Sequence, residues 1–406
     1  MAIDIDIDIG IRRKSEDVAA RRPPNRKALI RSAATDLFVR RGYHNVSVAD
    51  VAETVGITPA ALYHHYRNKQ DLLLHTVLDA LDTVDTTIRT AGDLDAAIRA
   101  LTALVVGPGN LLAVWERESR HLEESQRAAV QDREADIVAD FLPLLRAERP
   151  DLDAPEAELV ARAVLGTLGG QSLRRGAPRR KEEALVFRLA AAVARAPLTP
   201  APTRPPEPEP APGPYGTGTS MPRRRRDQLL TEAVRLFDER GYQSVTMADI
   251  GEAAGIVASG VYRHFPSKTD ILVTAMNRGG EQLRTGAERA FSLARSADEV
   301  LALLLRAHVS VTVEQRHLVG LLTHERNHLP NKERTALRHY QVDYMDVWLQ
   351  ALGAVEPEYG DSDLRTVVHA AHAMIHFVVR TTTAPFSPDL PERLTELGTA
   401  LLSAKR

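Results

Sequence analysis

The stretch RGYHNVSVADVAETVGITPAALYHHYRNKQDLL, residues 41–73, decides how this sequence folds. Ser47 and Thr58 each precede a short run with helical apolar spacing, and a hydroxyl at that place accepts an orphan backbone amide of the helix start. Gly56 lies between the two runs, where a tight turn needs a residue that tolerates a left-handed backbone. The stretch therefore predicts two short helices joined by a glycine turn, over residues 48–55 and 59–66.

A second copy of this stretch lies at residues 240–272 and reads RGYQSVTMADIGEAAGIVASGVYRHFPSKTDIL. The two copies align without a gap at a constant offset of 199 positions, and fourteen of the 33 positions are identical. Chance does not give such a match. Two copies with a long period indicate duplication of a whole domain, because a solenoid needs more and shorter units.

An amphipathic helix precedes each copy. Its apolar residues recur at i, i+3, i+4, i+7 and i+8, which is the spacing of one buried helix face. The first copy carries this stripe at Ile30, Ala33, Ala34, Leu37 and Phe38, and the second at Leu229, Ala233, Leu236 and Phe237. No sustained alternation typical of strands follows residue 10, so we expect an all-α protein.

A proline-rich run separates the two copies. Residues 196–222 hold ten of the chain's 24 prolines, and such a segment prefers extended polyproline II to a packed core. The first 24 residues repeat aspartate and end in Arg-Arg-Pro-Pro, which favours a solvated tail. The expected order is a tail at 1–24, a short-helix domain at 25–73, a helical domain at 74–195, a linker at 196–222, a second short-helix domain at 223–272 and a second helical domain at 273–406.

The composition excludes several classes of protein. The chain has 406 residues, 44% of them hydrophobic, which is enough for two domains with sizeable cores. It has no cysteine, so disulfides, thiolate metal sites and cysteine nucleophiles are excluded. No basic-then-apolar leader and no apolar run of membrane length occur, so we expect a cytoplasmic protein. Without a nucleophile elbow, phosphate loop or HExxH motif, we expect no enzyme, no cofactor and no metal.

Two short helices joined by a glycine turn form the helix-turn-helix pattern, whose second helix enters the major groove of DNA. Pro59 suits the first position of the second helix, where a missing amide costs nothing. Basic residues precede each copy and would neutralise phosphates beside a groove. They are Arg26, Lys27 and Arg31 in the first copy and Arg223 to Arg226 in the second.

The two copies resemble the DNA-binding region of TetR-family regulators. The resemblance rests on a tyrosine in the second helix, an aromatic residue three positions on, and a lysine shortly after it. It covers about 50 residues in each half and runs from Gly42 to Leu72 in the first. The resemblance implies two TetR-like modules, each with a helix-turn-helix domain followed by a helical domain for ligand binding and dimerisation.

The resemblance also implies which residues contact DNA. Positions that match Ser47, Tyr63, His65 and Lys69 contact phosphates or bases in the family, and Thr246, Tyr262, His264 and Lys268 match them in the second copy. From the helices themselves we add Thr58, Pro59, Ala60, Ala61 and His64, and Ala258, Ser259, Gly260 and Arg263. Leu62, Tyr66, Val261 and Phe265 are expected to be core.

We call the second helix of each helix-turn-helix unit its reading helix, and the two reading helices differ in sequence. Arg263 can donate two hydrogen bonds to a guanine edge, whereas His64, its counterpart, cannot. Val257 stands where Thr58 caps the first helix, and Gly260 costs about 1 kcal/mol in a helix relative to alanine. We therefore expect an asymmetric operator with unlike half-sites. The alternative is a regulator in which only the first head binds DNA.

A short string recurs in the helical halves. Glu118-x-x-His121-Leu122 with Arg127 returns as Glu325-x-x-His328-Leu329 with Arg334. Residues 114–127 resemble the pocket helix of lipid- and steroid-responsive TetR members, and the tandem layout is similar to repressors of mammalian-cell-entry lipid-import operons. The resemblance implies a small hydrophobic effector of lipid, steroid or acyl type. Candidate ligand contacts are Trp115, Glu118, His121, His324, Glu325 and His328, and shared packing of these residues is the competing interpretation.

The second helical half is rich in aromatic residues and histidine. Tyr340, Tyr344 and Trp348 share one helix face, and the two tyrosines are candidate ligand contacts, although such a stripe is more often core. His369, His372 and His376 share another face, with a spacing that can hold zinc. No carboxylate interleaves as a zinc motif requires, so metal or acid sensing is the second hypothesis.

The remaining helices suggest how the halves assemble. In the family the last two helices of a module form a four-helix bundle with a partner. The long linker lets the halves pair within one chain, as a pseudo-dimer, with further homodimerisation left open. We therefore expect an effector-released repressor that binds double-stranded operator DNA and no membrane. The predicted bundle helices are residues 154–175, 178–195, 363–383 and 389–404.

Overall fold

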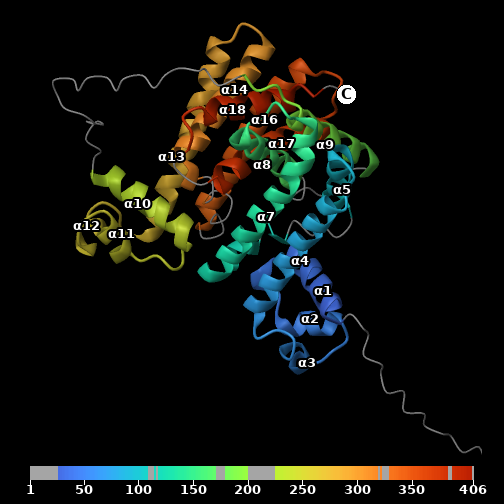
Figure 1. The fold of residues 1–406 in the computed structure, drawn as a ribbon. Helices are drawn as coiled ribbons and strands as arrows, with labels where there is room; N and C mark the ends of the chain where they lie inside the picture. The colour runs from blue at the N-terminus through green and yellow to red at the C-terminus, as the bar shows by residue number, and fades with distance from the viewer. Residues whose placement is uncertain are drawn as a thin grey trace, which may run out of the picture.

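The computed structural model describes residues 26–107, 114–115, 118–170, 179–199, 225–318, 321, 329–382 and 386–404. Within these ranges every regular element is a helix, and no strand occurs (Figure 1). The expectation of an all-α protein is confirmed. The tail at 1–24, most of the linker and His324, Glu325 and His328 lie outside the described residues.

The first half begins with a small three-helix head and continues into longer helices. The head ends where α4 begins (Figure 1). We call the helices from α4 to α9 the regulatory part of this half, and those from α13 to α18 the regulatory part of the second half. The elements are α1 Arg26–Arg41, η1 Tyr43–Asn45, α2 Val48–Thr54, α3 Pro59–Tyr63, α4 Lys69–Arg89, α5 Leu94–Val106, η2 Ser119–His121, α7 Glu124–Glu148, α8 Ala154–Gly169 and α9 Arg179–Ala194.

The second half repeats this order. Its head also has three helices, and α13 leads from the head into the second regulatory part (Figure 1). The elements are α10 Arg225–Arg240, α11 Met247–Ala253, α12 Ala258–Tyr262, α13 Lys268–Leu293, α14 Ala297–Glu314, α16 Asn331–Val355, α17 Asp361–Thr381 and α18 Leu390–Leu402.

The local signals in the sequence form the head as expected. Ser47 caps α2 by accepting from the Asp50 amide, while the Asp50 carboxylate accepts from the Ser47 amide in return. Thr246 and Asp249 make the same reciprocal capping box at α11. Such a box satisfies two backbone donors that a helix start leaves without partners.

The glycine turns take the left-handed backbone that the sequence requires. Gly56 has φ +67° and Gly255 has φ +69°, and no other residue type has a positive φ among the described residues. A side chain at either position would be strained, because L-residues other than glycine avoid this region. Each turn therefore fixes the angle between the first and second short helices.

Two regulatory parts pack against each other along their last helices. α8 lies against α17 and α9 lies against α18, and α9 also contacts α17 (Figure 1). The helices α8 and α17 approach very closely, since a Cβ on Gly170 would lie 2.1 Å from the Cβ of Ala373. One hydrophobic core includes residues from both regulatory parts.

A buried arginine joins the halves. The Arg393 guanidinium on α18 is 5% exposed and lies 2.8 Å from Glu156, which belongs to the first turn of α8. It also pairs with Asp389 and Glu396 of its own helix and donates to the Thr199 carbonyl. A charge at this depth stays ionised only with such partners, so the network fixes how α8 and α18 meet.

Residues 196–199 belong to the packed structure, although the sequence places them in the linker. Ala196 is buried, and Arg149 donates to its carbonyl at 3.0 Å. The Thr199 amide donates to Glu396 at 3.2 Å. The proline-rich composition did not indicate these bonds, because they depend on side chains far away in the sequence.

Three of the expected helical segments differ from the observed ones. The second short helix of the first head was expected over residues 59–66 but ends at Tyr63. Its counterpart in the second head ends at the matching residue, Tyr262. The segment 114–127 is not one helix. Leu122 is extended after the 3-10 turn Ser119–His121, and α7 starts anew at Glu124.

Candidate nucleic-acid interface and regulatory cavity

The short helices α3 and α12 present their aromatic residues to solvent. Tyr63 is 52% exposed and Tyr262 is 55% exposed, which is unusual for tyrosines in a folded domain of this kind. Also exposed are Ser47, Thr58, Pro59, Ala60 and His64 in the first head, and Thr246, Ser259 and Arg263 in the second; Ala61, His65, Ala258, Gly260 and His264 are partly buried. The surface offered to a groove therefore contains the predicted residues of both heads.

The opposite face of each short helix is core, as predicted. Leu62 and Val261 are fully buried, and the aromatic residues Tyr66 and Phe265 are 2% exposed or less. This burial fixes the rotation of α3 and α12. Tyr63 and Tyr262, one position after the buried Leu62 and Val261, therefore lie on another face of each helix, because it is side chains three or four residues apart that share a face.

The starts of the two reading helices differ. The Thr58 hydroxyl accepts from the Ala61 amide at 3.2 Å, and Pro59 takes the first helical position. Val257 offers no side-chain cap to α12, whose first turn is closed instead by the Gly260 amide donating to the Val257 carbonyl at 2.8 Å. The second reading helix thus forms without the cap that stabilises the first.

Lys69 and Lys268, which occupy the same position in the two copies, have a role inside each head. The Lys268 ammonium lies within 2.5–3.2 Å of the carbonyls of Tyr242, Gln243 and Val245, so these contacts use three donors. The Lys69 ammonium lies 4.0 Å from the centre of the Tyr43 ring. Both lysines therefore brace the turn that follows the first helix, a role that the sequence did not predict.

Basic residues flank the heads, and some are already paired. Arg31 lies 2.7 Å from Asp79 of α4, which ties α1 to that helix. Arg226 stacks over the Phe265 ring at 4.4 Å, and Arg225 donates to the Ala254 carbonyl. Lys27 of α1 is exposed. Among the predicted phosphate-binding residues that the structure describes, Arg31 is thus the one held by a carboxylate.

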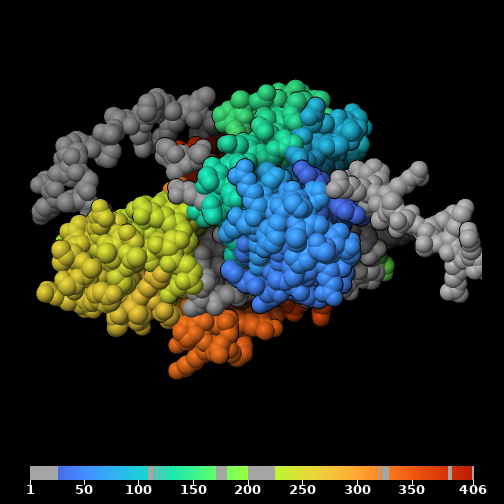
Figure 2. Space-filling model, turned by 90° about the horizontal axis from the view of Figure 1, so that it is seen from below, coloured from blue at the N-terminus to red at the C-terminus, as the bar shows by residue number. Residues whose placement is uncertain are grey.

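The two heads project from the regulatory parts as separate lobes. Figure 1 shows the first head at the lower end of α4 and the second at the lower end of α13. In the view from below, neither head covers the other, and both present surface to the viewer (Figure 2). Both are therefore open to a large ligand from this side.

Glu118 and His121 contact the first head. The Tyr43 amide donates to the Glu118 carboxylate at 3.1 Å, and Glu118 is 4% exposed. His121 lies 3.5 Å from the same carboxylate, and its ring stacks on Tyr43 with the ring centres 5.2 Å apart. These two residues were predicted to contact a ligand, but they join the regulatory part to the head and do not line the cavity described next.

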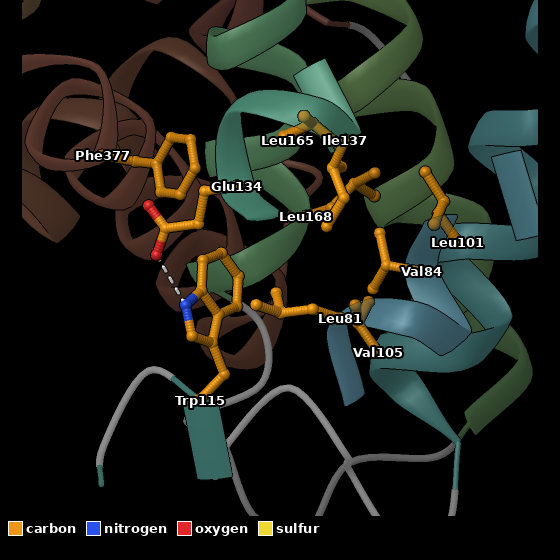
Figure 3. Close-up of a pocket in the computed structure, with 10 residues that line it drawn as sticks. All are labelled: Leu81, Val84, Leu101, Val105, Trp115, Glu134, Ile137, Leu165, Leu168 and Phe377. Carbon is orange, nitrogen blue, oxygen red and sulfur yellow. Dashed lines mark hydrogen bonds between the residues drawn. The ribbon is translucent and has the colours of Figure 1, made fainter. Parts of the chain in front are cut away.

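A cavity lies inside the first regulatory part. Its walls are almost entirely apolar, and the space open to the centre of a water molecule is small, about 30 Å³. Figure 3 shows the side chains converging from several helices, with Phe377 entering from the second half. The lining residues are Leu81, Val84, Leu101, Val105, Trp115, Glu134, Ile137, Leu165, Leu168 and Phe377.

Glu134 is the polar residue of this cavity. Its carboxylate accepts a hydrogen bond of 2.7 Å from the Trp115 indole, at the end of the cavity where Phe377 lies (Figure 3). Burial raises the pKa of Glu134, against the opposing influence of Arg380, the Trp115 hydrogen bond and Arg162. Trp115 was predicted as a ligand contact and lines the cavity. Glu134 and Phe377 were not predicted, because neither has a local sequence signal.

Tyr340 and Tyr344 pack in the second half with the histidines. The Tyr344 hydroxyl lies 3.1 Å from His308 Nδ1, and the Tyr340 and Tyr344 rings stack. The His308 ring stacks on His372 and His376, with ring centres 4.1 Å and 5.2 Å away. Neither tyrosine lines the cavity of the first half.

These histidines are neutral at pH 7. Burial lowers the pKa of His308 and His372 well below the usual value and lowers that of His376 to about 4. In the part of the chain that the structure describes, no three His, Cys, Asp or Glu side chains form a group able to hold a metal ion. No helix in that part is long and apolar enough to cross a membrane.

A family model matches each head. The model of bacterial regulatory proteins of the TetR family matches residues 30–76 and again residues 229–275. The two matched regions begin inside α1 and α10 and end inside α4 and α13, so they contain both helix-turn-helix units.

Curated relatives match parts of the chain. A transcriptional repressor of Rhodococcus jostii, KstR2, is 28% identical over 131 residues, which is 32% of this chain and 64% of the relative. The transcriptional activator FasR of Mycolicibacterium smegmatis is 35% identical over 66 residues, or 16% of this chain and 30% of the relative. The chain thus spans less than two thirds of the length of these relatives.

Among solved structures, the ketosteroid transcriptional regulator KstR2 of Mycobacterium tuberculosis superposes with a TM-score of 0.41 at 20% sequence identity. The superposition covers 44% of this chain and 94% of that one.

Proposed function

Because this chain is a tandem member of the TetR family of bacterial regulators, we propose that it represses transcription by binding operator DNA through both of its heads. The observation that carries the proposal is the pair of short helices α3 and α12. Each is buried on one face and exposes a tyrosine flanked by polar or basic residues on the other. An exposed second helix of a helix-turn-helix is the element that enters a major groove.

The exposed side chains divide into two kinds of contact. The exposed Tyr63 and Tyr262 carry hydroxyls suited to phosphate oxygens. The hydroxyls of Ser47 and Thr246 already donate to the carboxylates of their capping boxes at 2.6 Å, so these two residues would act on DNA by fixing the starts of α2 and α11. Lys69 and Lys268 brace the head and would act on DNA through the position of the turn. Phosphate contacts position the protein, while base contacts provide the sequence preference.

The operator that fits the two heads is asymmetric. Arg263, the residue that follows α12, is exposed and can form a bidentate pair with a guanine, whereas the residue that follows α3 is His64. We propose unlike half-sites, with a guanine read by the second head. A good bidentate pair provides about 1–3 kcal/mol of discrimination against the wrong base.

The two halves act as a pseudo-dimer within one chain. The close approach of α8 and α17 and the buried network around Arg393 support this pairing, because both are made between halves of the same chain. The arrangement needs no second copy to present two heads. Two heads must then reach major grooves about 34 Å apart per helical turn of the DNA.

A small hydrophobic effector would release the repressor. The apolar lining of the cavity favours a ligand of lipid, steroid or acyl type, and Glu134 offers one hydrogen-bonding group to it. Trp115 lines the cavity and lies three residues before Glu118, which holds the Tyr43 turn of the first head. An effector that is larger than the small cavity must displace its walls, and this contact would carry the displacement to the head.

Footprinting on the DNA beside the chain's own gene, with light scattering to size the complex, tests the proposal. We expect one chain to protect one asymmetric site of about two major-groove turns. Arg263→Ala should weaken binding roughly tenfold or more, in line with the loss of a bidentate base contact. Arg306→Ala, which removes an exposed arginine of α14 far from the head, is the matched control.

Two results would overturn parts of this account. Two chains on a palindrome, with Arg263→Ala harmless, would show that only the first head binds DNA and that pairing occurs between chains. No protected site at low salt, where phosphate contacts are strongest, would overturn DNA binding itself.

A further inference from the structure

The helix caps give a residue-by-residue correspondence between the two regulatory parts. The N-caps of α5 and α14 are Asp93 and Ser296, an offset of 203 positions. The N-caps of α8 and α17 are Asp153 and Gly360, an offset of 207, and α7 and α16 keep the same offset. The cavity residues on α5, α7 and α8 therefore have defined counterparts in the second half.

Three wall residues of the cavity have polar counterparts in the second half. Val105 corresponds to His308, Ile137 to Tyr344 and Leu165 to His372. Those three counterparts are in mutual contact: Tyr344 hydrogen-bonds His308, and the imidazoles of His308 and His372 stack at 4.1 Å. The second half thus fills with rings the place where the first half keeps an apolar space.

The rings also carry polar atoms that an apolar guest cannot pair. The Nε2 atoms of His308 and His372 are buried and have no hydrogen-bond partner among the described residues. A hydrocarbon bound beside them could not donate to either atom, so it would not recover the free energy that their burial already costs. The corresponding valine and leucine of the first half carry no such polar atom.

The two helices α8 and α17 also contribute unequally to their contact. Phe377 of α17 crosses to the first half, lines its cavity and lies with its ring centre 5.9 Å from that of Trp115. Gly166 makes room for it, since a Cβ there would lie 2.7 Å from the Phe377 Cβ. The residue of α8 that corresponds to Phe377 is Gly170, which has no side chain to send back.

We propose that this chain has a single apolar ligand site, built from the first regulatory part and closed by Phe377 of the second, and that His308, Tyr344 and His372 block the corresponding site. The ligand is an apolar molecule, bound once per chain. The role of this site in releasing a repressor rests on the proposed function. The number of sites, one and not two, does not depend on whether the chain binds DNA.

Xenon is the probe, because it is apolar, monatomic and enters dry cavities lined by aliphatic side chains. The full-length protein is labelled at Leu, Ile and Val methyl groups, and their NMR shifts are followed as xenon pressure rises. We expect saturating shifts at Leu101 and Leu168, which line the cavity. No saturating shift is expected at Leu304 and Ile375, which are their counterparts.

Two variants invert the pattern. Leu165→His places the second-half residue in the first-half cavity and should abolish the shifts at Leu101 and Leu168. The triple substitution His308→Val, Tyr344→Ile, His372→Leu should make Leu304 and Ile375 respond. The wild-type measurement decides the proposal by itself if a variant fails to fold.

Saturating shifts at both pairs of methyl groups in the wild type would overturn the single site. Shifts at neither pair would overturn the apolar site itself. The footprint separates these outcomes from failure of the proposed function, since a chain that binds no operator could still take up xenon at one site.

Discussion

The helix that leads from each head into the regulatory part differs between the two halves. α4 buries Val77, Leu81 and Ile88 in one core that is continuous with the first head. In α13 the positions of Ala80 and Leu81 are taken by Gly279 and Gly280, and the second head has a separate core. The two heads thus share their caps and glycine turns, but they differ in how they connect to the regulatory part.

The glycines of α13 have a packing reason. A Cβ on Gly279 would lie 2.2 Å from Leu318, so this position must stay small for Leu318 to reach the second head's core. Gly280 faces Tyr340, whose ring lies 3.4 Å from where a Cβ would be. The second head thus has a hydrophobic core of its own, whereas the first head shares one core with the residues that line the cavity.

The largest expected effect comes from giving α4 the glycine of α13. Leu81→Gly removes a fully buried side chain and adds the backbone cost of a helical glycine, together about 4–6 kcal/mol of unfolding free energy. Denaturant unfolding measures this loss. The mirror change, Gly280→Ala, should stabilise the protein by about 0.5–1 kcal/mol, because its Cβ meets Tyr340 at ordinary contact distance.

Equal and small effects of these two substitutions would mean that the cores of the two halves are organised alike, contrary to the comparison.

Acid should weaken the second half first. His308, His372 and His376 have folded pKa values below that of an unfolded histidine, so the unfolded chain binds more protons as the pH falls. The stability that these neutral histidines contribute is therefore fully present above about pH 6.5 and is lost as the pH falls below that value. For His376 alone, with a pKa of about 4, the loss reaches about 3 kcal/mol.

Urea unfolding at several pH values, compared with His376→Leu, isolates this loss from the titration of carboxylates. Since these three buried imidazoles stay neutral in that range, His376→Leu should leave the dependence of operator affinity on pH between 6 and 8 unchanged. A change in affinity that His376→Leu removes would support acid sensing instead.

Glu118→Ala should release the turn of the first head and leave the second unchanged. A buried hydrogen bond to a charged group contributes about 1.5–3 kcal/mol, and the Tyr43 amide depends on it. Hydrogen exchange at that amide should accelerate, while the Tyr242 amide is the internal control. Glu118→Gln keeps an acceptor and should restore part of the protection; equal exchange in all three proteins would show that the contact is not stabilising.

The smallest effect concerns the reading helices. Val257→Thr supplies the cap that Thr58 gives the first head and should stabilise the second head by about 1 kcal/mol. Thr58→Val is the reverse change and should cost a similar amount. Hydrogen exchange of the amides in α12 measures the first change, and exchange in α3 measures the second. If Val257→Thr leaves the exchange rates in α12 unchanged, the backbone bond from Gly260 to Val257 already replaces the cap.

The sequence predicted the parts of this protein that depend on local backbone chemistry. Ser47, Thr58 and the glycine turns act within a few residues of themselves, so their roles could be inferred from type and position. Leu62 and Phe265 could be assigned to the core from helical spacing. The DNA contacts inferred from the family resemblance stay predictions.

The contacts between distant segments could not be predicted in this way. Nothing near Arg393 in the chain indicates that Glu156 will be its partner, and Phe377 looks like any apolar residue of an amphipathic helix. Glu118 has the polarity of a ligand contact, but the Tyr43 amide uses that polarity. Where two partners lie more than 70 residues apart, only the folded chain shows which polar group is already satisfied.

The central claim is that one chain presents two unequal heads to one operator. The most direct test compares three DNA duplexes of equal length: the natural site with both half-sites, and two palindromes that each repeat one half-site. We predict that one chain binds the natural duplex tightest and that each palindrome loses affinity roughly tenfold or more, since one mismatched base pair costs about 1–3 kcal/mol. A palindrome bound as tightly as the natural site, by two chains, would contradict the claim.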